Sequence, residues 1–212
     1  MLKEKSNAFE FPPIHISARC INKQWFDLPL EQVWRIFENY LFFVHHAFEI
    51  EIISFVLMSN HFHLLVRVPQ GNLSQAMNYF MRETSRQIGR DAGRINQTYG
   101  GRYFRCYIHS NNYFLSAYKY VYRNPVESGA AKKVEDYKFS SLYAILGGQH
   151  SMIPIAQDQL LFSDIAGTLH WLNAGRESSN YLAMKSALKK KKMEFGNDRK
   201  TRKPHILTTD LY

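Results

Sequence analysis

Residues 57–66, LMSNHFHLLV, place two histidines one residue apart inside an apolar run. Ser59 and Asn60 are typical turn residues, so the histidines are expected to begin a new extended segment. Side chains on a strand point alternately to its two faces, which puts His61 and His63 on the same face. Leu or Val would pack better than an imidazole at either position. We therefore expect one face of the strand to be apolar and the other to present both rings to a partner that the rest of the chain has to identify.

The surrounding sequence alternates β-type runs with segments of helical periodicity. Alternating and β-branched residues predict strands at 14–21, 48–58, 61–68 and 100–109. Apolar side chains at helical spacing predict helices at 28–46, 73–93 and 110–124. Ser110 is a suitable N-cap for the last of these helices, and Pro125 is expected to end it. The order predicts an α+β fold, a ferredoxin-like antiparallel sheet (βαββαβ) with helices on one face.

The 212-residue chain is long enough for one domain with an appendage, and 45% of its residues are hydrophobic. We expect a catalytic domain over residues 1–150, in which 125–150 is irregular. Helical periodicity at 154–175 and 178–195 predicts a helical extension over residues 151–195. The tail at 196–212 is polar and basic, and we expect it to be disordered.

The sequence carries no signal for secretion or membrane insertion. The N-terminal residues have no apolar signal core, and no apolar run is long enough to span a bilayer. The two cysteines, Cys20 and Cys106, have no metal-binding or redox spacing. These features predict a reduced, cytoplasmic protein without a membrane partner.

Positive charge is concentrated in two segments of the chain. The formal net charge is +9, yet residues 82–123 hold eight Lys or Arg against two Asp or Glu, and residues 181–203 hold nine against two. Residues 1–81 and 124–180 are slightly acidic. Charge placed in blocks favours a polyanionic partner, and nucleic acid is the commonest polyanion.

Two chemical interpretations of the histidine pair are open from its spacing alone. Neutral imidazoles at i and i+2 of a strand are suitable ligands for a divalent cation. Two protein ligands would leave coordination positions for a substrate, which suits a catalytic metal better than a structural one. The alternative is that one or both rings only form hydrogen bonds within the fold.

Three segments together resemble a known protein family. VLMSNHFHLLV, GGRYFRCYI and YKYVYRNPVESGAAKKVEDYKFSS are similar to segments of the HUH endonucleases, in particular the single-tyrosine transposases, over about residues 14–145. The last segment resembles the REP-associated tyrosine transposases more than the insertion-sequence enzymes, in which Gln usually stands at the position of Asn124. Ser59 stands where the family often has Pro, a change at a turn from which we expect little consequence.

The resemblance implies a transposase that cleaves and rejoins single-stranded DNA near a hairpin. It implies that His61 and His63 hold Mg²⁺ or Mn²⁺ on the scissile phosphate, and that Tyr120 attacks the phosphate to form a 5′-phosphotyrosine. A phenol with a pKa of about 10 is a weak nucleophile. A cation on the phosphate oxygens would offset the developing charge and orient the phosphate.

Four tyrosines lie on the predicted helix, and core packing is the ordinary role for any of them. Tyr118 and Tyr122 are four residues apart and form one stripe. Tyr120 lies on a different face, where its i+4 partner Asn124 offers an amide oxygen as a third metal ligand. The family pattern selects the same pair, and Tyr113, one heptad earlier, is the competing nucleophile.

Basic residues on three segments are candidates for DNA contact. Four arginines at i+4 spacing form a stripe on the second predicted helix: Arg82, Arg86, Arg90 and Arg94. Two more lie on the fourth predicted strand, Arg102 and Arg105, and a lysine run follows in the extension: Lys189, Lys190, Lys191 and Lys192. Any of these faces could instead be merely solvated. Tyr103, Phe104 and Tyr107 either stack on unpaired bases or belong to the core.

Two functional alternatives to the transposase are open. One is a replication-initiator or relaxase-type nickase, although such proteins usually carry further domains or a second tyrosine. The other is a catalytically silent, sequence- or hairpin-specific DNA-binding protein, which would not require His61, His63, Tyr120 and Asn124 together. The active site could form within one chain or across a homodimer.

Overall fold

The structure, a computed structural model, describes residues 9–175 and 178–195. The strands are β1 (Ile14–Arg19), β2 (Glu51–Leu57), β3 (His61–Arg67) and β4 (Phe104–Tyr107). The first helices are α1 (Leu30–Phe48), α2 (Leu73–Asp91) and α3 (Asn111–Glu127). Short 3₁₀ turns lie at Ile21–Lys23 and Val134–Asp136, and the later helices are α4 (Ser141–Ile145), α5 (Gln159–Ser163), α6 (Ile165–Asn173) and α7 (Ser178–Ala187).

The four strands form one sheet in the order β2-β3-β1-β4, and every neighbouring pair is antiparallel. This is the ferredoxin-like arrangement, so the predicted α+β fold is confirmed. In the β1–β3 register Ser17 lies opposite His63, and Arg19 lies opposite His61. Directly opposed residues share a face, so β1 contributes its odd-numbered side chains to the histidine face.

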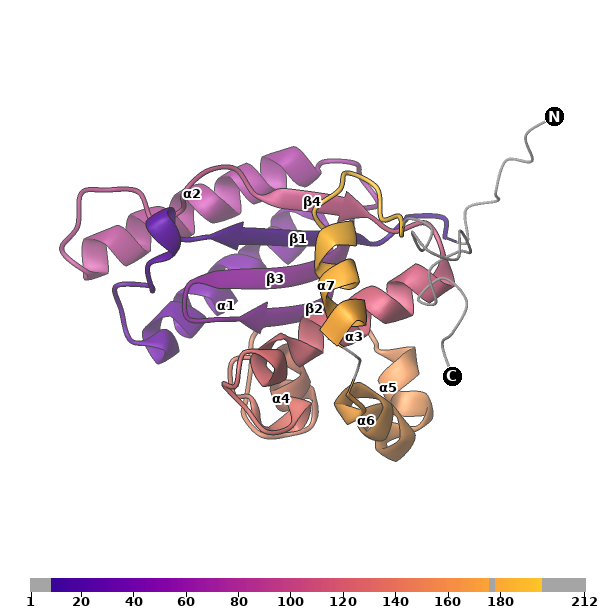
Figure 1. The fold of residues 1–212 in the computed structure, drawn as a ribbon. Helices are drawn as coiled ribbons and strands as arrows, with labels where there is room; N and C mark the ends of the chain where they lie inside the picture. Colours follow the sequence, from indigo (N-terminus) through magenta and orange to yellow (C-terminus); the bar gives the residue numbers. More distant parts are fainter. Residues whose placement is uncertain (1–8, 176–177, 196–212) are drawn as a thin grey trace.

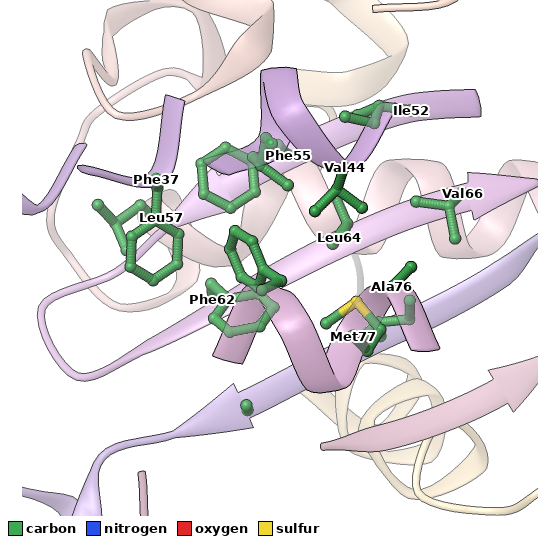
Figure 2. Packing of buried hydrophobic residues seen from close by; sticks show 14 of the residues in the cluster. Phe37, Val44, Ile52, Phe55, Leu57, Phe62, Leu64, Val66, Ala76 and Met77 are labelled. Atoms are coloured by element: carbon green, nitrogen blue, oxygen red, sulfur yellow. The ribbon is translucent and has the colours of Figure 1, made fainter. Parts of the chain in front are cut away.

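Helices α1 and α2 cover one face of the sheet and enclose an aromatic core with it (Figure 1). Phe62 of β3 is fully buried, and its ring meets those of Phe37 and Phe80 edge to face, with centroids 5.5 and 5.6 Å apart. Figure 2 shows Phe37, Phe55 and Phe62 gathered together in this layer. The side chain between the two histidines therefore anchors β3 to this core, and the imidazoles project from the opposite face.

A second core lies on the histidine face of the sheet. It joins Leu65 of β3 and Cys106 of β4 to Val121 of α3 and Met184 of α7. Figure 1 shows α7 crossing the sheet on the side opposite α1 and α2. Helices α1 and α2 thus form the helical layer that was predicted on one face of the sheet. Helix α3 and the extension cover part of the other face.

Helix α3 continues past the proline that was expected to end it. Ser110 caps its first turn by accepting a hydrogen bond from the backbone N–H of Tyr113, as predicted. Pro125, however, lies inside the helix, which ends at Glu127. A proline in the last turn removes only one backbone donor, and the next turn is still closed by the hydrogen bond from Ser128 N–H to the carbonyl of Asn124.

The predicted extension packs directly on α3. Its first predicted helical segment is two helices, α5 and α6, each capped by an aspartate side chain. The buried Arg123 guanidinium donates to the carbonyl oxygens of Leu172 and Asn173 at the end of α6. Residues 125–150, expected to be irregular, contain the second 3₁₀ turn and α4. The tail at 196–212, expected to be disordered, lies outside the described residues.

Both edges of the sheet are paired with other segments. On β2, Ile52 bridges to Ile155 and Val56 bridges to Ser140. On β4, the backbone of Tyr107 donates a hydrogen bond to Lys191 of the lysine run and accepts one from the following residue but one, Met193. The lysine run, Lys189 to Lys192, therefore lies along the edge of β4, directly after α7 ends at Ala187.

Within the described residues, no helix is long and apolar enough to cross a membrane. The cytoplasmic location stays a prediction.

Candidate active site

The two histidines of β3 line a pocket of about 440 Å³ on the face of the sheet opposite α1 and α2. The hairpin that precedes them is closed by a hydrogen bond from Met58 N–H to the carbonyl of His61. His61 is half-buried, with its Nδ1 2.7 Å from the side-chain oxygen of Asn60. His63 is buried, with 6% of its surface exposed. The expected common face of the two rings is therefore a pocket wall.

Both imidazoles are held in the neutral form. Burial, with a smaller contribution from nearby positive charge, lowers the pKa of His61 to about 4. Burial, followed by the neighbouring rings of His61 and His15 and the same positive charges, holds the pKa of His63 well below its ordinary value of 6.5. The Nδ1 atom of His63 is 2.9 Å from Nε2 of His15, while its own Nε2 is buried without a partner among the described residues. A neutral ring with an unpartnered nitrogen can donate a lone pair to a cation.

Tyr120 of α3 meets the histidines across the pocket. Its ring lies 5.5 Å from that of His63, with the two planes at 89°. On its other side it stacks on Tyr181 of α7, with centroids 5.4 Å apart. Burial raises the pKa of Tyr120 above its ordinary value of 10, so the phenol is protonated at neutral pH.

Asn124 lies one helical turn after Tyr120 and also lines the pocket. Its amide nitrogen donates to the backbone carbonyl of Tyr120 at 2.7 Å. Its amide oxygen accepts a hydrogen bond from the hydroxyl of Tyr181 at 3.4 Å. The donor end of the side chain is thus fixed to α3, which leaves the oxygen as the end available to a ligand in the pocket.

The other three tyrosines of α3 are engaged elsewhere. The hydroxyl of Tyr118 donates to the carboxylate of Asp158, and that of Tyr122 pairs with Ser141 at 3.0 Å. Both rings are fully buried in the second core. Tyr113 is half-buried and meets the ring of Phe195 edge to face. Core packing is therefore the observed role of the Tyr118 and Tyr122 stripe.

The remaining pocket wall is basic and partly aromatic. Arg19 at the end of β1, Lys185 of α7 and Lys189 bring positive charge to it, and Glu127 brings one carboxylate, which is paired with Arg123. Phe104 of β4 also lines the pocket and is 61% exposed. A large exposed ring beside positive charge is the combination that single-stranded nucleic-acid sites use.

The predicted arginine stripe lies away from this pocket. Helix α2 covers the opposite face of the sheet, and both Arg82 and Arg86 contact the carboxylate of Glu83. Arg90 is exposed on the same helix. The stripe does not extend to Arg94, because α2 ends at Asp91 and Arg94 forms an ion pair with Asp27. The prediction of one continuous four-arginine stripe is therefore wrong.

The aromatic and basic residues near β4 divide between the two faces of the sheet. Arg102 is exposed before the strand begins. Arg105 lies over the ring of Tyr107, at 6.0 Å, and Tyr103 and Tyr107 pack against the first core. Phe104 points to the other face, toward the pocket. Of the three candidate stacking rings, Phe104 is thus the one placed beside the histidines.

Comparison with known proteins assigns the chain to a family. Residues 15–127, more than half of the chain, match the family model described as "Transposase IS200 like".

The chain belongs to the IS200-like transposase family.

The fold is also similar to a solved structure of a REP-associated tyrosine transposase bound to a REP hairpin. The TM-score is 0.54 at 19% sequence identity, and the match covers 74% of this chain and 93% of that chain. At this identity the likeness shows a shared fold. No curated protein matches the sequence.

In this IS200-like transposase the family match ends at Glu127, the last residue of α3. Tyr181, Lys185 and Lys189 therefore reach the pocket from outside the matched segment. Sequence reasoning missed the first two, as well as His15 and Arg19. The alternation of IHISAR could have placed His15 and Arg19 on one face of β1, but Tyr181 and Lys185 carry no local signal.

The donor set around the pocket fits a divalent cation bound with open positions. His61 and His63 offer neutral imidazoles, and Asn124 offers an amide oxygen, ligands that suit Mn²⁺ and, through oxygen, Mg²⁺. Across the part of the chain that the structure describes, no three His, Cys, Asp or Glu side chains form a metal-binding group. A cation bound by His61 and His63 would therefore need its further ligands from the Asn124 amide and from oxygen atoms of a substrate.

Proposed function

We propose that this IS200-like transposase cleaves and rejoins single-stranded DNA next to a hairpin, through a 5′-phosphotyrosine on Tyr120. The observation that supports this most is the arrangement of Tyr120 and His63, whose rings lie 5.5 Å apart within one basic pocket. A nucleophile and a metal ligand have to share such a site if the nucleophile is to attack a metal-bound phosphate.

In the proposed reaction the phenolic oxygen of Tyr120 attacks the scissile phosphorus. The new bond joins that oxygen to the phosphorus, and the bond from the phosphorus to the 3′ oxygen of the preceding nucleotide breaks. The phenol loses its proton, and the departing 3′ oxygen gains one to become a free 3′-OH. Attack by a 3′-OH on the phosphotyrosine reverses these changes, so the same site can rejoin a strand without hydrolysing it.

His61, His63 and the amide oxygen of Asn124 would hold Mg²⁺ or Mn²⁺. The bound cation would neutralise charge on the phosphate oxygens and orient the phosphate for in-line attack. The unpartnered Nε2 of His63 supports this role. A buried polar atom without a hydrogen bond lowers stability and calls for an explanation, and a bound cation would give this nitrogen a partner. Both rings are neutral, as metal ligands must be.

The pocket wall supports a single-stranded path for the DNA. Arg19, Lys185 and Lys189 could contact successive phosphates, while the exposed ring of Phe104 could stack on an unpaired base. The solved relative is bound to a REP hairpin, which supports a hairpin as the folded part of the substrate. All of these groups come from one chain, so the proposed site does not require a homodimer.

The proposal is tested with an end-labelled oligonucleotide that carries a hairpin and single-stranded flanks. Incubation with the protein in Mg²⁺ or Mn²⁺ is expected to give a shorter labelled strand and a rejoined product on a denaturing gel, and EDTA is expected to abolish both. Tight hairpin binding without cleavage would identify the catalytically silent DNA-binding protein instead. Cleavage that leaves a hydrolysed 5′-phosphate and no rejoined strand would indicate a hydrolytic nuclease and contradict the proposal.

A further inference from the structure

A third histidine, His15 of β1, lies behind the proposed metal ligand. Its Nε2 atom is 2.9 Å from Nδ1 of His63, and the two rings are stacked with centroids 5.1 Å apart. Both side chains are almost fully buried, with 2% and 6% of their surfaces exposed. The outer nitrogen of each ring, Nδ1 of His15 and Nε2 of His63, is buried without a partner among the described residues.

The stability of the folded state alone does not explain this buried pair of histidines. A buried polar atom that lacks a hydrogen bond lowers the stability of the folded state, and the pair leaves two such atoms. Replacing two hydrogen-bonded polar groups with apolar groups of the same shape is often neutral or favourable. The adjacent inward position on β3 is Leu65, a fully buried apolar residue, so an apolar pair would suit this layer. The pair is better explained by the chemistry of the pocket.

The hydrogen bond between the two rings contains one proton, and its position decides what His63 can do. If His15 donates from Nε2, His63 must carry its own proton on Nε2 and has no lone pair there for a cation. If His63 donates from Nδ1, its Nε2 presents a lone pair and His15 carries its proton on Nδ1. Without a ligand, both arrangements leave one donor and one acceptor unpartnered, so a cation at Nε2 selects the second arrangement.

We propose that His15 is a positioning residue that accepts a hydrogen bond from Nδ1 of His63 and so holds His63 as the tautomer that binds a divalent cation through Nε2. This inference rests on the metal site of the proposed function. Partners that accept the second N–H of a metal-bound histidine fix its ring and its tautomer, and their removal typically weakens metal binding 10–100-fold. His15 itself then need not touch the cation or the DNA.

The test compares Mn²⁺ affinity among full-length variants, measured by the decrease of the electron paramagnetic resonance signal of free Mn²⁺. His15→Phe removes the acceptor but keeps a buried ring, and is expected to weaken Mn²⁺ binding about 10–100-fold. His15→Gln can place an amide oxygen where Nε2 lies, and is expected to restore most of the affinity. His61→Ala, which removes a proposed ligand, is the reference for loss of the site.

Different outcomes separate this inference from the proposed function. Unchanged Mn²⁺ affinity in His15→Phe, with His61→Ala impaired, would overturn the role of His15 and leave the metal site standing. Equal losses in His15→Gln and His15→Phe would also overturn it, because a ligand nitrogen rather than an acceptor would then be required. A wild-type protein that binds no Mn²⁺ would refute the metal site itself, and the role of His15 with it.

A second measurement uses the wild-type protein and does not depend on the folding of a variant. Long-range ¹H–¹⁵N spectra report which nitrogen of a histidine carries the proton, and His63→Gln identifies the signals of His63. In the presence of Mg²⁺ we expect His63 with its proton on Nδ1 and His15 as the acceptor. A proton on Nε2 of His63 in a protein shown to bind the cation would overturn the inference.

Discussion

The ring of Tyr120 lies 5.5 Å from that of His63, and their planes are nearly perpendicular, at 89°. The two residues are 57 positions apart in sequence, on α3 and β3. Each is buried, and each faces a pocket that basic side chains surround. This relationship would allow the candidate nucleophile and a candidate metal ligand to act on one substrate phosphate.

Substitution of either β3 histidine is expected to abolish cleavage of hairpin DNA. His61→Ala and His63→Ala each remove one of the two imidazole ligands proposed for the cation. Both side chains face the pocket, so the first core under β3 should be unaffected. The gel cleavage assay measures activity, and circular dichroism checks that the fold is retained. Full cleavage by the wild type in EDTA would be incompatible with a metal role.

Tyr120→Phe is expected to remove the covalent DNA adduct and to retain DNA binding. Only the phenolic oxygen is removed, so the packing of the ring on Tyr181 should be preserved. Tyr113→Phe is the matched control, because that residue lies on the same helix and is half-buried against Phe195. We expect the control to form the adduct at the wild-type level. The assignment fails if the control loses the adduct and Tyr120→Phe keeps it.

Asn124→Ala is expected to have an intermediate effect that depends on metal concentration. It removes one proposed oxygen ligand but leaves Tyr120 and both histidines in place. Cleavage should be weaker than in the wild type at low Mg²⁺ and should recover as Mg²⁺ is raised. Titration of Mg²⁺ in the gel assay measures this, and a defect that is the same at every Mg²⁺ concentration would argue against a ligand role.

Lysines of the pocket wall are expected to matter more for single-stranded DNA than the arginines of α2. Lys185 and Lys189 face the pocket, whereas Arg82 and Arg86 lie on the opposite face of the sheet and share Glu83. Removal of one phosphate-binding charge should reduce the steepness of log K against log salt concentration by about 0.7. Binding of the Lys185→Ala, Lys189→Ala double variant should therefore show a shallower slope, measured at several salt concentrations.

The arginine variant Arg82→Ala, Arg86→Ala is the matched comparison, because it also removes two positive charges. We expect its salt slope on a single-stranded oligonucleotide to stay near that of the wild type. If the arginine variant has the shallower slope and the lysine variant keeps that of the wild type, then the DNA follows α2 and not the pocket wall.

Local periodicity predicted the order of strands and helices along the chain. It also predicted that the two β3 histidines share one face of their strand. The alternation of side chains between the two faces of a strand can be read from each segment by itself. It therefore also placed Phe62, now in the first core, on the face opposite the imidazoles. The ends of α2 and α3 were harder to predict. Pro125 is tolerated in α3 because it lies in the last turn of the helix. Arg94 does not continue the arginine stripe of α2 because that helix ends at Asp91.

The rest of the pocket depends on tertiary packing that a single sequence does not display. The contact between His15 and His63 requires the register of β1 against β3, which is set by both strands at once. Tyr181 stacks on Tyr120 from 61 residues away, because α7 packs on α3 and the sheet. The position of the lysine run likewise depends on its pairing with the edge of β4.

The buried imidazole of His15 is expected to make stability fall with acidity. Burial lowers its pKa from 6.5 to about 3 in the folded protein, so the unfolded chain binds more protons between these values. The stability that it contributes is present above pH 6.5 and is lost as the pH falls toward 3. The slope approaches about 1.4 kcal/mol per pH unit for one such group. Urea unfolding of His15→Phe should show a shallower pH dependence than the wild type between pH 6.5 and 5, and equal slopes would contradict this.

The most direct test of the central claim is to identify the residue that becomes linked to DNA. The wild-type protein is incubated with a single-stranded hairpin oligonucleotide and Mn²⁺, the products are digested with nuclease and protease, and the peptides are analysed by mass spectrometry. We expect one modified peptide, with a 5′-linked nucleotide on Tyr120. A covalent nucleotide on any other residue, or cleaved and rejoined DNA without a protein-linked intermediate, would contradict the account.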